Sequence, residues 1–164
     1  HAEVQRALGI PWVHLMALVA DAVRARHPAG TRVGLLATDG TLATRLYHRT
    51  LEARGLVPVA PAPDSPVQAR VRAAIGDPAT GIKATGAAVS AQAREHLAAA
   101  AAWCVAQGAS VIVPACTEVS IGLSEGVPAG PAVVDPLEVA ADVLLDLAAG
   151  RVEPAALYLG EARS

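Results

Sequence analysis

Gly108-Ala109-Ser110-Val111-Ile112-Val113-Pro114-Ala115-Cys116-Thr117-Glu118 is the stretch that decides the fold of this 164-residue chain. Its short apolar run, 111–113, is typical of a strand that is buried on both faces of a parallel sheet, and the run ends at Pro114. In open α/β sheets the reactive groups lie just beyond the carboxyl ends of the strands. The stretch therefore predicts a strand that presents Cys116 at the functional edge of such a sheet.

Helix-like and strand-like segments alternate on both sides of this stretch. The expected strands are 10–15, 32–37, 56–60, 111–113 and 132–134. The expected helices are 2–8, 16–26, one that ends near 54 with Gly55 as its C-cap, 67–75, 87–107, a short one that runs toward 123, and 137–149 with Asp135 as its N-cap. The segment 80–86 is a mixed polar stretch. This order predicts an α/β fold in which helices flank a parallel sheet.

The composition excludes several classes of protein. Hydrophobic residues make up 53% of the chain and charged residues 17%, which excludes a disordered chain, and the absence of phenylalanine predicts a core of Ala, Val and Leu. A net charge of −2 with scattered basic residues argues against nucleic acid as a partner. The apolar runs are too short to span a membrane. Two cysteines without metal-ligand spacing predict neither a disulfide framework nor a metal site, and we expect a cytoplasmic location.

Cys116 is the first candidate for chemistry. At a strand-to-helix turn, exposed amides and the positive end of the helix dipole favour a thiolate, so we expect Cys116 to exchange protons near neutral pH. A buried structural thiol is the competing interpretation, but such a thiol has no need of the Thr117-Glu118 pair that follows. The other cysteine, Cys104, lies inside a predicted helix and is expected to be core.

Two further features are expected at the same edge of the sheet. The turn Thr38-Asp39-Gly40-Thr41 follows the strand 32–37, and its hydroxyls and amides are suited to a carboxylate or phosphate, although plain helix capping explains Thr38 or Thr41 as well. Lys83 is the only lysine of the chain and stands among apolar and small residues. A solvated loop lysine is the alternative interpretation.

Four stretches together resemble the cofactor-independent aspartate/glutamate racemases, and within them the aspartate-racemase branch. They are 33–41, 82–84, 108–120 and 134–137, and they occur in the order of the family. The Cys-Thr-Glu element combined with the upstream Ala-Thr-Asp-Gly-Thr turn is the most specific part of this resemblance. Either element alone is modest evidence.

The resemblance implies two similar α/β lobes with the active site between them, of which this chain is mainly the second. Each lobe contributes one cysteine, and the two thiols remove and return the α-proton on opposite faces of an amino acid without pyridoxal phosphate or a metal. The residues that match the family's site are Cys116 as one acid/base, Lys83 for the side-chain carboxylate of the substrate, Thr38 and Thr117 for its α-carboxylate, Glu118 for its ammonium group or the thiol, Gly40 and Thr41 in the cradle, and His1. A small dicarboxylic amino acid is the expected partner, and homodimers are common in the family.

One departure from the family pattern concerns the first cysteine. In the family it lies in a Cys-Asn-Thr-Ala-His element, and this chain opens with His1-Ala2, which resembles the end of that element. We therefore expect 1–27 to be a remnant of the first lobe, 28–134 to be the lobe that carries Cys116, and 135–164 to be a C-terminal helix and tail. On this interpretation the partner thiol lies upstream of residue 1, and the 164 residues alone are inactive.

Two other functions remain open. Maleate isomerases, hydantoin racemases and arylmalonate decarboxylases resemble the same fold and also use one or two cysteines, but Lys83 favours a substrate with a second carboxylate. A non-catalytic domain that binds an amino acid is the third hypothesis.

Overall fold

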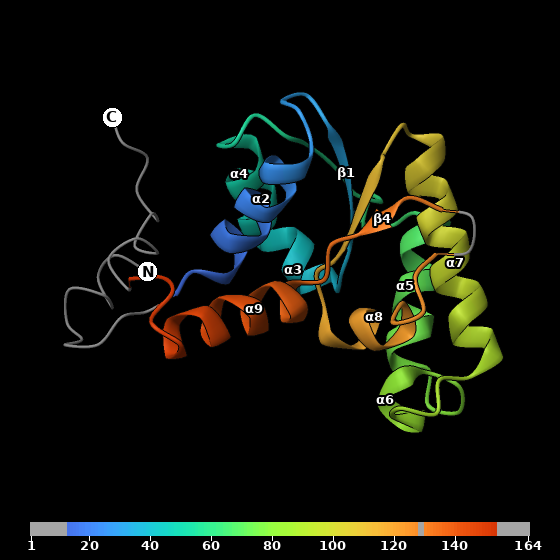
Figure 1. Ribbon diagram of the computed structural model, residues 1–164. Coiled ribbons are helices and arrows are strands. Elements are labelled where there is room, and N and C mark those ends of the chain that lie inside the picture. The colour runs from blue at the N-terminus through green and yellow to red at the C-terminus, as the bar shows by residue number, and fades with distance from the viewer. Residues whose placement is uncertain (1–12, 128–129, 154–164) are drawn as a thin grey trace.

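Four parallel strands form the centre of the molecule, in the order β2-β1-β3-β4. The computed structural model describes residues 13–127 and 130–153, and it has helices on both faces of this sheet (Figure 1). The α/β architecture with a parallel sheet flanked by helices is thereby confirmed. The strands are β1 (Arg32–Leu36), β2 (Val57–Val59), β3 (Val111–Pro114) and β4 (Ala132–Val133). The helices are α2 (Leu15–Arg26), α3 (Asp39–Thr44), α4 (Leu46–Glu52), α5 (Pro66–Gly76), α6 (Ile82–Thr85), α7 (Ala91–Ala106), α8 (Thr117–Gly122) and α9 (Pro136–Ala148).

The two central strands, β1 and β3, set the register of the sheet. Val33 pairs with Val111 and Leu36 pairs with Pro114, so the two strands end side by side. All four residues of β3 are buried, as are the last four of β1. Strands covered on both faces need continuous apolar runs, which explains why the sequence around 111–113 lacks the alternation of a half-exposed strand.

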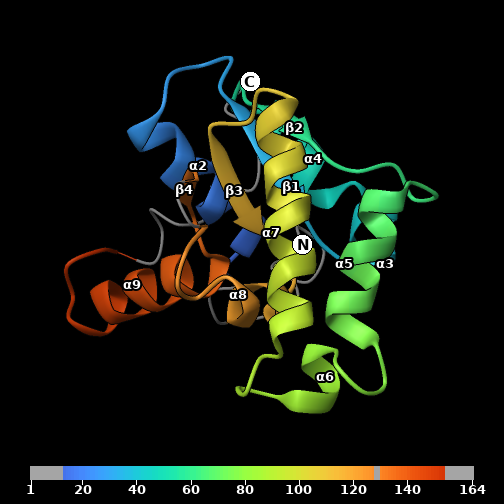
Figure 2. The same ribbon diagram turned by 90° about the vertical axis from the view of Figure 1, so that its right-hand side faces the viewer.

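Alternate side chains of these strands enter two separate cores. On one face, Val33 and Leu35 pack with α2 and α4, and on the other face Leu36 and Ile112 pack with α5 and α7. Figure 2 shows α5 and α7 side by side over that second face. Because the side-chain period of a strand is two, each strand feeds both cores, and the sheet lies between the two helical layers.

Helix α7 lies very close to β1, and Gly34 permits this approach. A Cβ atom added at Gly34 would lie 2.6 Å from Ile112 Cδ1 and 2.8 Å from Cys104 Cβ. Cys104 has no exposed surface, and burial raises the pKa of its thiol to about 12. The prediction that Cys104 is a core residue is confirmed.

Several expected boundaries were wrong for local reasons. No strand includes Val13–Leu15, because His14 is the N-cap of α2 and its Nδ1 accepts a hydrogen bond from the Ala17 N–H at 3.2 Å; the rest of 2–12 lies outside the described residues. The helix expected to end near 54 is divided into α3 and α4 at Arg45, whose φ of 53° is left-handed. The helix expected from 87 begins only at Ala91, because Ser90 caps it. The stretch 80–86 contains the short helix α6.

The first and last described helices lie beside each other. Val19 and Val23 of α2 share a core with β1, and α9 contacts α2. Within 13–127 and 130–153, no helix has the length and apolar character needed to cross a membrane. The division of the chain into 1–27, 28–134 and 135–164 stays a prediction.

Candidate active site

Two neighbouring strand ends carry most of the candidate residues. The Ala115 N–H donates to the Leu36 carbonyl at 2.9 Å, which continues the pairing of β1 with β3 one residue beyond Pro114. Thr38 and Cys116 each stand two residues past the last paired residues of their strands. The register therefore brings the 38–41 turn and the 116–118 turn to the same edge of the sheet, as the sequence predicted.

Cys116 is the half-buried N-cap residue of α8. Its Sγ donates a hydrogen bond to Glu118 Oε2 at 2.9 Å, and the Thr117 hydroxyl donates to the same oxygen at 3.1 Å. One carboxylate oxygen thus accepts both hydrogen bonds. The local sequence Cys-Thr-Glu folds back on itself at the start of the helix.

The protonation of Cys116 differs from the sequence expectation. Burial, followed by the hydrogen bond to Glu118, raises the pKa of the Cys116 thiol, and the amides of Glu118 and Val119 lower it by less. The helix start does favour a thiolate, but the adjacent carboxylate and the loss of solvent outweigh it. The raised pKa runs against the expectation that this thiol is acidic near neutral pH.

Glu118 shows the opposite effect. The hydrogen bond from Cys116 is the largest cause that lowers the pKa of Glu118, and the positive charge of Lys83 contributes as well. Lys83 is exposed on α6, which contacts α8. The structure thus brings Lys83 near the 116–118 turn.

The 38–41 turn caps helix α3. Thr38 Oγ1 accepts a hydrogen bond from the Thr41 N–H at 3.3 Å, and the two threonine hydroxyls are 3.0 Å apart. The helix-capping interpretation of Thr38 is confirmed. Gly40 and Thr41, however, also line a pocket of about 360 Å³.

This pocket lies beside the 38–41 turn. Its lining consists of Met16, Gly40, Thr41, Thr44, Leu46, Tyr47 and Ala115. Ala115 immediately precedes Cys116 in the chain, but Cys116 itself packs against the core on the other face of the sheet. The remaining lining groups are largely apolar, which favours expulsion of water from that side of the site.

Tyr47 is a residue of this site that the sequence analysis missed. It is 8% exposed, and burial, with further contributions from the charges of Asp135 and Cys116, raises its pKa to about 12. Tyr47 therefore carries a neutral hydroxyl near Asp135 and Cys116. Its position on a helix facing the core made it indistinguishable in the sequence from an ordinary core aromatic residue.

The start of α9 closes the same edge. Asp135 caps α9 through the Leu137 N–H at 2.8 Å, as the sequence predicted, and its Oδ1 also accepts from the buried Ser120 hydroxyl at 3.1 Å. Ser120 is one turn beyond Cys116 on α8. This bond fixes α8 to α9, and with it the orientation of the turn that carries the thiol.

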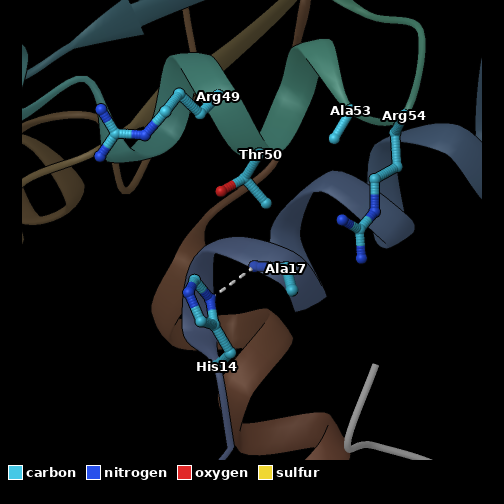
Figure 3. Close-up of a pocket in the computed structure, with 6 residues that line it drawn as sticks. All are labelled: His14, Ala17, Arg49, Thr50, Ala53 and Arg54. Atoms are coloured by element: carbon cyan, nitrogen blue, oxygen red, sulfur yellow. Dashed lines mark hydrogen bonds between the residues drawn. The ribbon is translucent and has the colours of Figure 1, made fainter. Parts of the chain in front are cut away.

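A second pocket, of about 160 Å³, lies between α2 and α4 on another part of the surface. His14, Arg49 and Arg54 are among its lining residues (Figure 3). Figure 3 shows the guanidinium groups of Arg49 and Arg54 extending in different directions, and Arg54 pairs with Asp21 at 3.0 Å. These cations do not converge on one ligand, and we take the sheet edge that carries Cys116 and the 38–41 turn as the candidate active site.

Two further predictions about this site concern His1 and metal binding. His1 lies outside the described residues. Within the described part of the chain, no three His, Cys, Asp or Glu side chains are grouped so as to hold a metal ion.

Comparisons with known proteins bear on the family and the fold of the chain. The model of a protein family described as Asp/Glu/Hydantoin racemase matches residues 1–144. The structure is similar to that of an aspartate racemase homologue from Pyrococcus horikoshii OT3, with a TM-score of 0.68 and 24% sequence identity over 90% of this chain and 61% of that one. It is also similar to Picrophilus torridus aspartate racemase, with a TM-score of 0.61 and 22% identity over 84% of this chain and 52% of that one. At these identities the structures show a shared fold, and this chain spans between 52% and 61% of their length.

Proposed function

The chain belongs to the Asp/Glu/hydantoin racemase family, and on that premise we propose that it takes part in racemisation of an amino acid at its α-carbon, with Cys116 as one acid/base. The observation that carries the proposal is the Cys116–Glu118 hydrogen bond at the sheet edge that also carries the 38–41 turn. A thiol with its proton held in place thus stands at the same edge as hydroxyls and amides suited to a carboxylate.

The protonation of the site assigns a direction to the first proton transfer. Because Glu118 accepts the thiol proton in a hydrogen bond and the pKa of Cys116 is raised, we propose that Cys116 acts first as the acid. A base on the opposite face breaks the α-C–H bond, and the electron pair stays on carbon as an enolate-like anion. The S–H proton of Cys116 then forms the new C–H bond on the other face and leaves a thiolate, which is the base for the reverse reaction.

The α-proton of an amino acid is a very weak acid, so the developing charge needs preorganised donors. The Thr117 hydroxyl and the 38–41 turn are the donors proposed for the substrate carboxylate. The ammonium group of the substrate is proposed to lie at Glu118, where it offsets the carboxylate charge that disfavours a thiolate. Substrate binding is thereby proposed to bring the pKa of the thiol closer to neutrality.

Aspartate or glutamate is the substrate that we propose. Lys83 is the only lysine of the chain and lies near Glu118, where an ammonium group can pair with a second carboxylate. The names of the similar structures agree with this choice. No pyridoxal phosphate or metal is needed for the proposed chemistry.

The opposing base is proposed to be a thiol outside these 164 residues. The sequence contains one other cysteine, Cys104, and it is fully buried between α7 and the sheet. A group without solvent access at that place cannot reach the substrate of Cys116. We accordingly propose that the 164 residues alone do not complete racemisation.

The test of this function is a panel of both enantiomers of aspartate, glutamate and leucine, followed by circular dichroism with the complete protein. The proposal predicts loss of optical activity for aspartate or glutamate. No change with any of them would refute it. Isomerisation of maleate would favour a related cysteine isomerase, and calorimetric binding without α-proton exchange in deuterated water would favour a binding domain.

A further inference from the structure

The 38–41 turn has a second side, which faces α5 rather than the pocket. Gln68 on α5 has no exposed surface, and its Nε2 donates to the Ala37 carbonyl at 3.0 Å and to Asp39 Oδ1 at 2.7 Å. These two acceptors belong to the residues immediately before and after Thr38. One buried amide group therefore holds the backbone on one side of Thr38 and the side chain on the other.

Arg72 adds to this contact from one turn later on α5. Its Nη1 donates to Asp39 Oδ2 at 3.0 Å and to the Pro63 carbonyl at 2.9 Å. The side chains of Arg72 and Asp39 are each 45% exposed, so the ion pair is screened by solvent and contributes little. The buried bonds of Gln68 are consequently the stronger part of the attachment, and its hydrogen bond is the largest cause that lowers the pKa of Asp39.

Core packing alone does not account for an amide at this position. Gln68 Oε1 is buried and has no hydrogen-bond partner among the described residues, which costs roughly 1–3 kcal/mol. A methionine of similar shape would fill the same space without that cost. What the amide adds is a pair of directed bonds to the turn.

We propose that Gln68 is a positioning residue of the active site, which holds the 38–41 turn so that Thr41 and the backbone at Gly40 face the pocket. Its effect on turnover rests on the proposed racemase function. Its effect on the turn does not, because Thr38 and Thr41 cap α3 with or without a substrate. Two separate measurements follow from this distinction.

The first measurement is amide hydrogen exchange by NMR on the 164-residue chain carrying Gln68→Met. The Thr41 N–H bonds Thr38 Oγ1 and the Leu42 N–H bonds the Thr38 carbonyl, so both report on the turn. We expect these two amides to exchange about tenfold faster, as expected for the loss of about 1.4 kcal/mol from two hydrogen bonds. The Ala115 N–H, bonded to Leu36 at the adjacent strand end, is expected to change less than about twofold, because a local opening does not involve it. An equal acceleration at all three amides would overturn the proposal, since a purely structural residue acts in that way.

If Gln68→Met does not fold, a pair of substitutions at Asp39 tests the same hydrogen bond. Asp39→Asn keeps an oxygen that accepts from Gln68, whereas Asp39→Ala removes it, and both remove the charge. We expect faster exchange at Thr41 in Asp39→Ala alone. Equal behaviour of the two variants would overturn the role of the Gln68 bond.

The second measurement is turnover of aspartate by the complete protein. Gln68→Met is expected to raise KM about tenfold while kcat falls less than about threefold, because the turn contacts the carboxylate in both the ground state and the transition state. Arg70→Met, at an exposed position of the same helix, is the matched control and leaves both constants unchanged. A fall in kcat with KM unchanged would contradict the positioning role. Absence of turnover in the wild-type protein would refute the proposed function, and the amide exchange would still decide whether Gln68 holds the turn.

Discussion

At the scale of single residues, the chemistry of the site depends on how one proton is shared. Cys116 and Glu118 are two residues apart, and the thiol proton lies between Sγ and a carboxylate oxygen at a separation of 2.9 Å. This pair explains why the pKa of the thiol is raised while that of the carboxyl is lowered. Cys116 is therefore the proton donor of this pair.

Replacing the carboxylate tests this explanation. Glu118→Gln removes the negative charge that disfavours a thiolate, so the pKa of Cys116 is expected to fall, although burial still keeps it raised. The rate of alkylation by iodoacetamide at pH 8 should increase several-fold, because the reaction follows the thiolate fraction. Mass spectrometry of the labelled chain measures it.

Glu125→Gln is the charge-matched control, because Glu125 is 80% exposed and pairs with Arg94 away from the thiol. Its alkylation rate should equal that of the wild type. A Glu118→Gln variant that reacts more slowly than wild type would show that the carboxylate acts as a base toward the thiol, contrary to our account.

The sequence predicted which residues meet at this site but not how they are protonated. The Cys-Thr-Glu element and the 38–41 turn could be placed because parallel strands end at one edge. The direction in which the pKa of the thiol is shifted could not be predicted, because it depends on the side chain of Glu118 folding back onto Sγ. Tyr47 and Gln68 were missed for a related reason, since a buried tyrosine or glutamine has the same periodicity as any other core residue.

At the scale of elements, the short helix α3 carries a glycine that the fold itself does not require. A Cβ atom added at Gly40 would meet nothing within 4 Å, and its φ is not left-handed. Gly40→Ala should therefore fold with equal or greater stability, by up to about 1 kcal/mol, since alanine has the better helix propensity. The added methyl would project at the pocket that Gly40 lines, and affinity for aspartate should fall about tenfold, which corresponds to about 1.4 kcal/mol.

The matched control is Gly76→Ala at the end of α5, where an added Cβ also meets no atom within 4 Å. Thermal unfolding and calorimetric titration with aspartate measure both effects. Unaltered affinity in Gly40→Ala would place the ligand away from this turn.

Helix α4 contains a histidine whose charge the fold disfavours. Burial, followed by the nearby Arg45, lowers the pKa of His48 from its usual value of 6.5, and its buried Nδ1 has no hydrogen-bond partner among the described residues. A histidine whose pKa is lower in the folded state stabilises the fold above pH 6.5, and this contribution is lost as the pH falls toward the folded pKa. The free energy of unfolding in urea should decrease from pH 7.5 to pH 5.5.

In His48→Gln this decrease should be smaller, while His27→Gln at the C-cap of α2 should behave like the wild type. An identical pH dependence in His48→Gln and wild type would mean that another group is responsible.

The break between α3 and α4 depends on tertiary packing, which the sequence pattern of a single helix does not reveal. A single helix was expected to end near 54, because the apolar residues keep a helical period past Arg45. Arg45 adopts φ 53°, and arginine has no side-chain feature that favours that conformation. The packing of Leu42 and Tyr47 into one core requires the turn, and this is a tertiary effect.

At the scale of the whole molecule, a parallel sheet flanked by helices was predictable because buried apolar runs alternate with helical segments along the chain. The four strands 32–36, 57–59, 111–114 and 132–133 were all identified within two residues of their ends. The packing of α2 on this sheet could not be predicted, because nothing in its sequence indicates whether it packs on this sheet or on another lobe.

Helix α9 supplies a candidate surface for a homodimer of the kind that the family resemblance implies. Leu137, Leu144 and Leu145 are 48%, 56% and 63% exposed, which is unusual for leucines on one helix. We expect the chain to associate through this face. Analytical ultracentrifugation should show a mass that rises with concentration, and Leu144→Gln with Leu145→Gln should abolish the rise. Leu46→Gln, at a 40% exposed site on α4, is the control, and a monomer at all concentrations would contradict the expectation.

The central claim is that Cys116 transfers a proton at the α-carbon of the substrate. Incorporation of deuterium from deuterated water into aspartate, followed by NMR with the complete protein, tests it most directly when Cys116→Ser and Cys104→Ser are compared with wild type. We predict that Cys116→Ser loses both exchange and racemisation while it keeps its fold, and that Cys104→Ser retains both. Racemisation by Cys116→Ser at the wild-type rate would contradict the account.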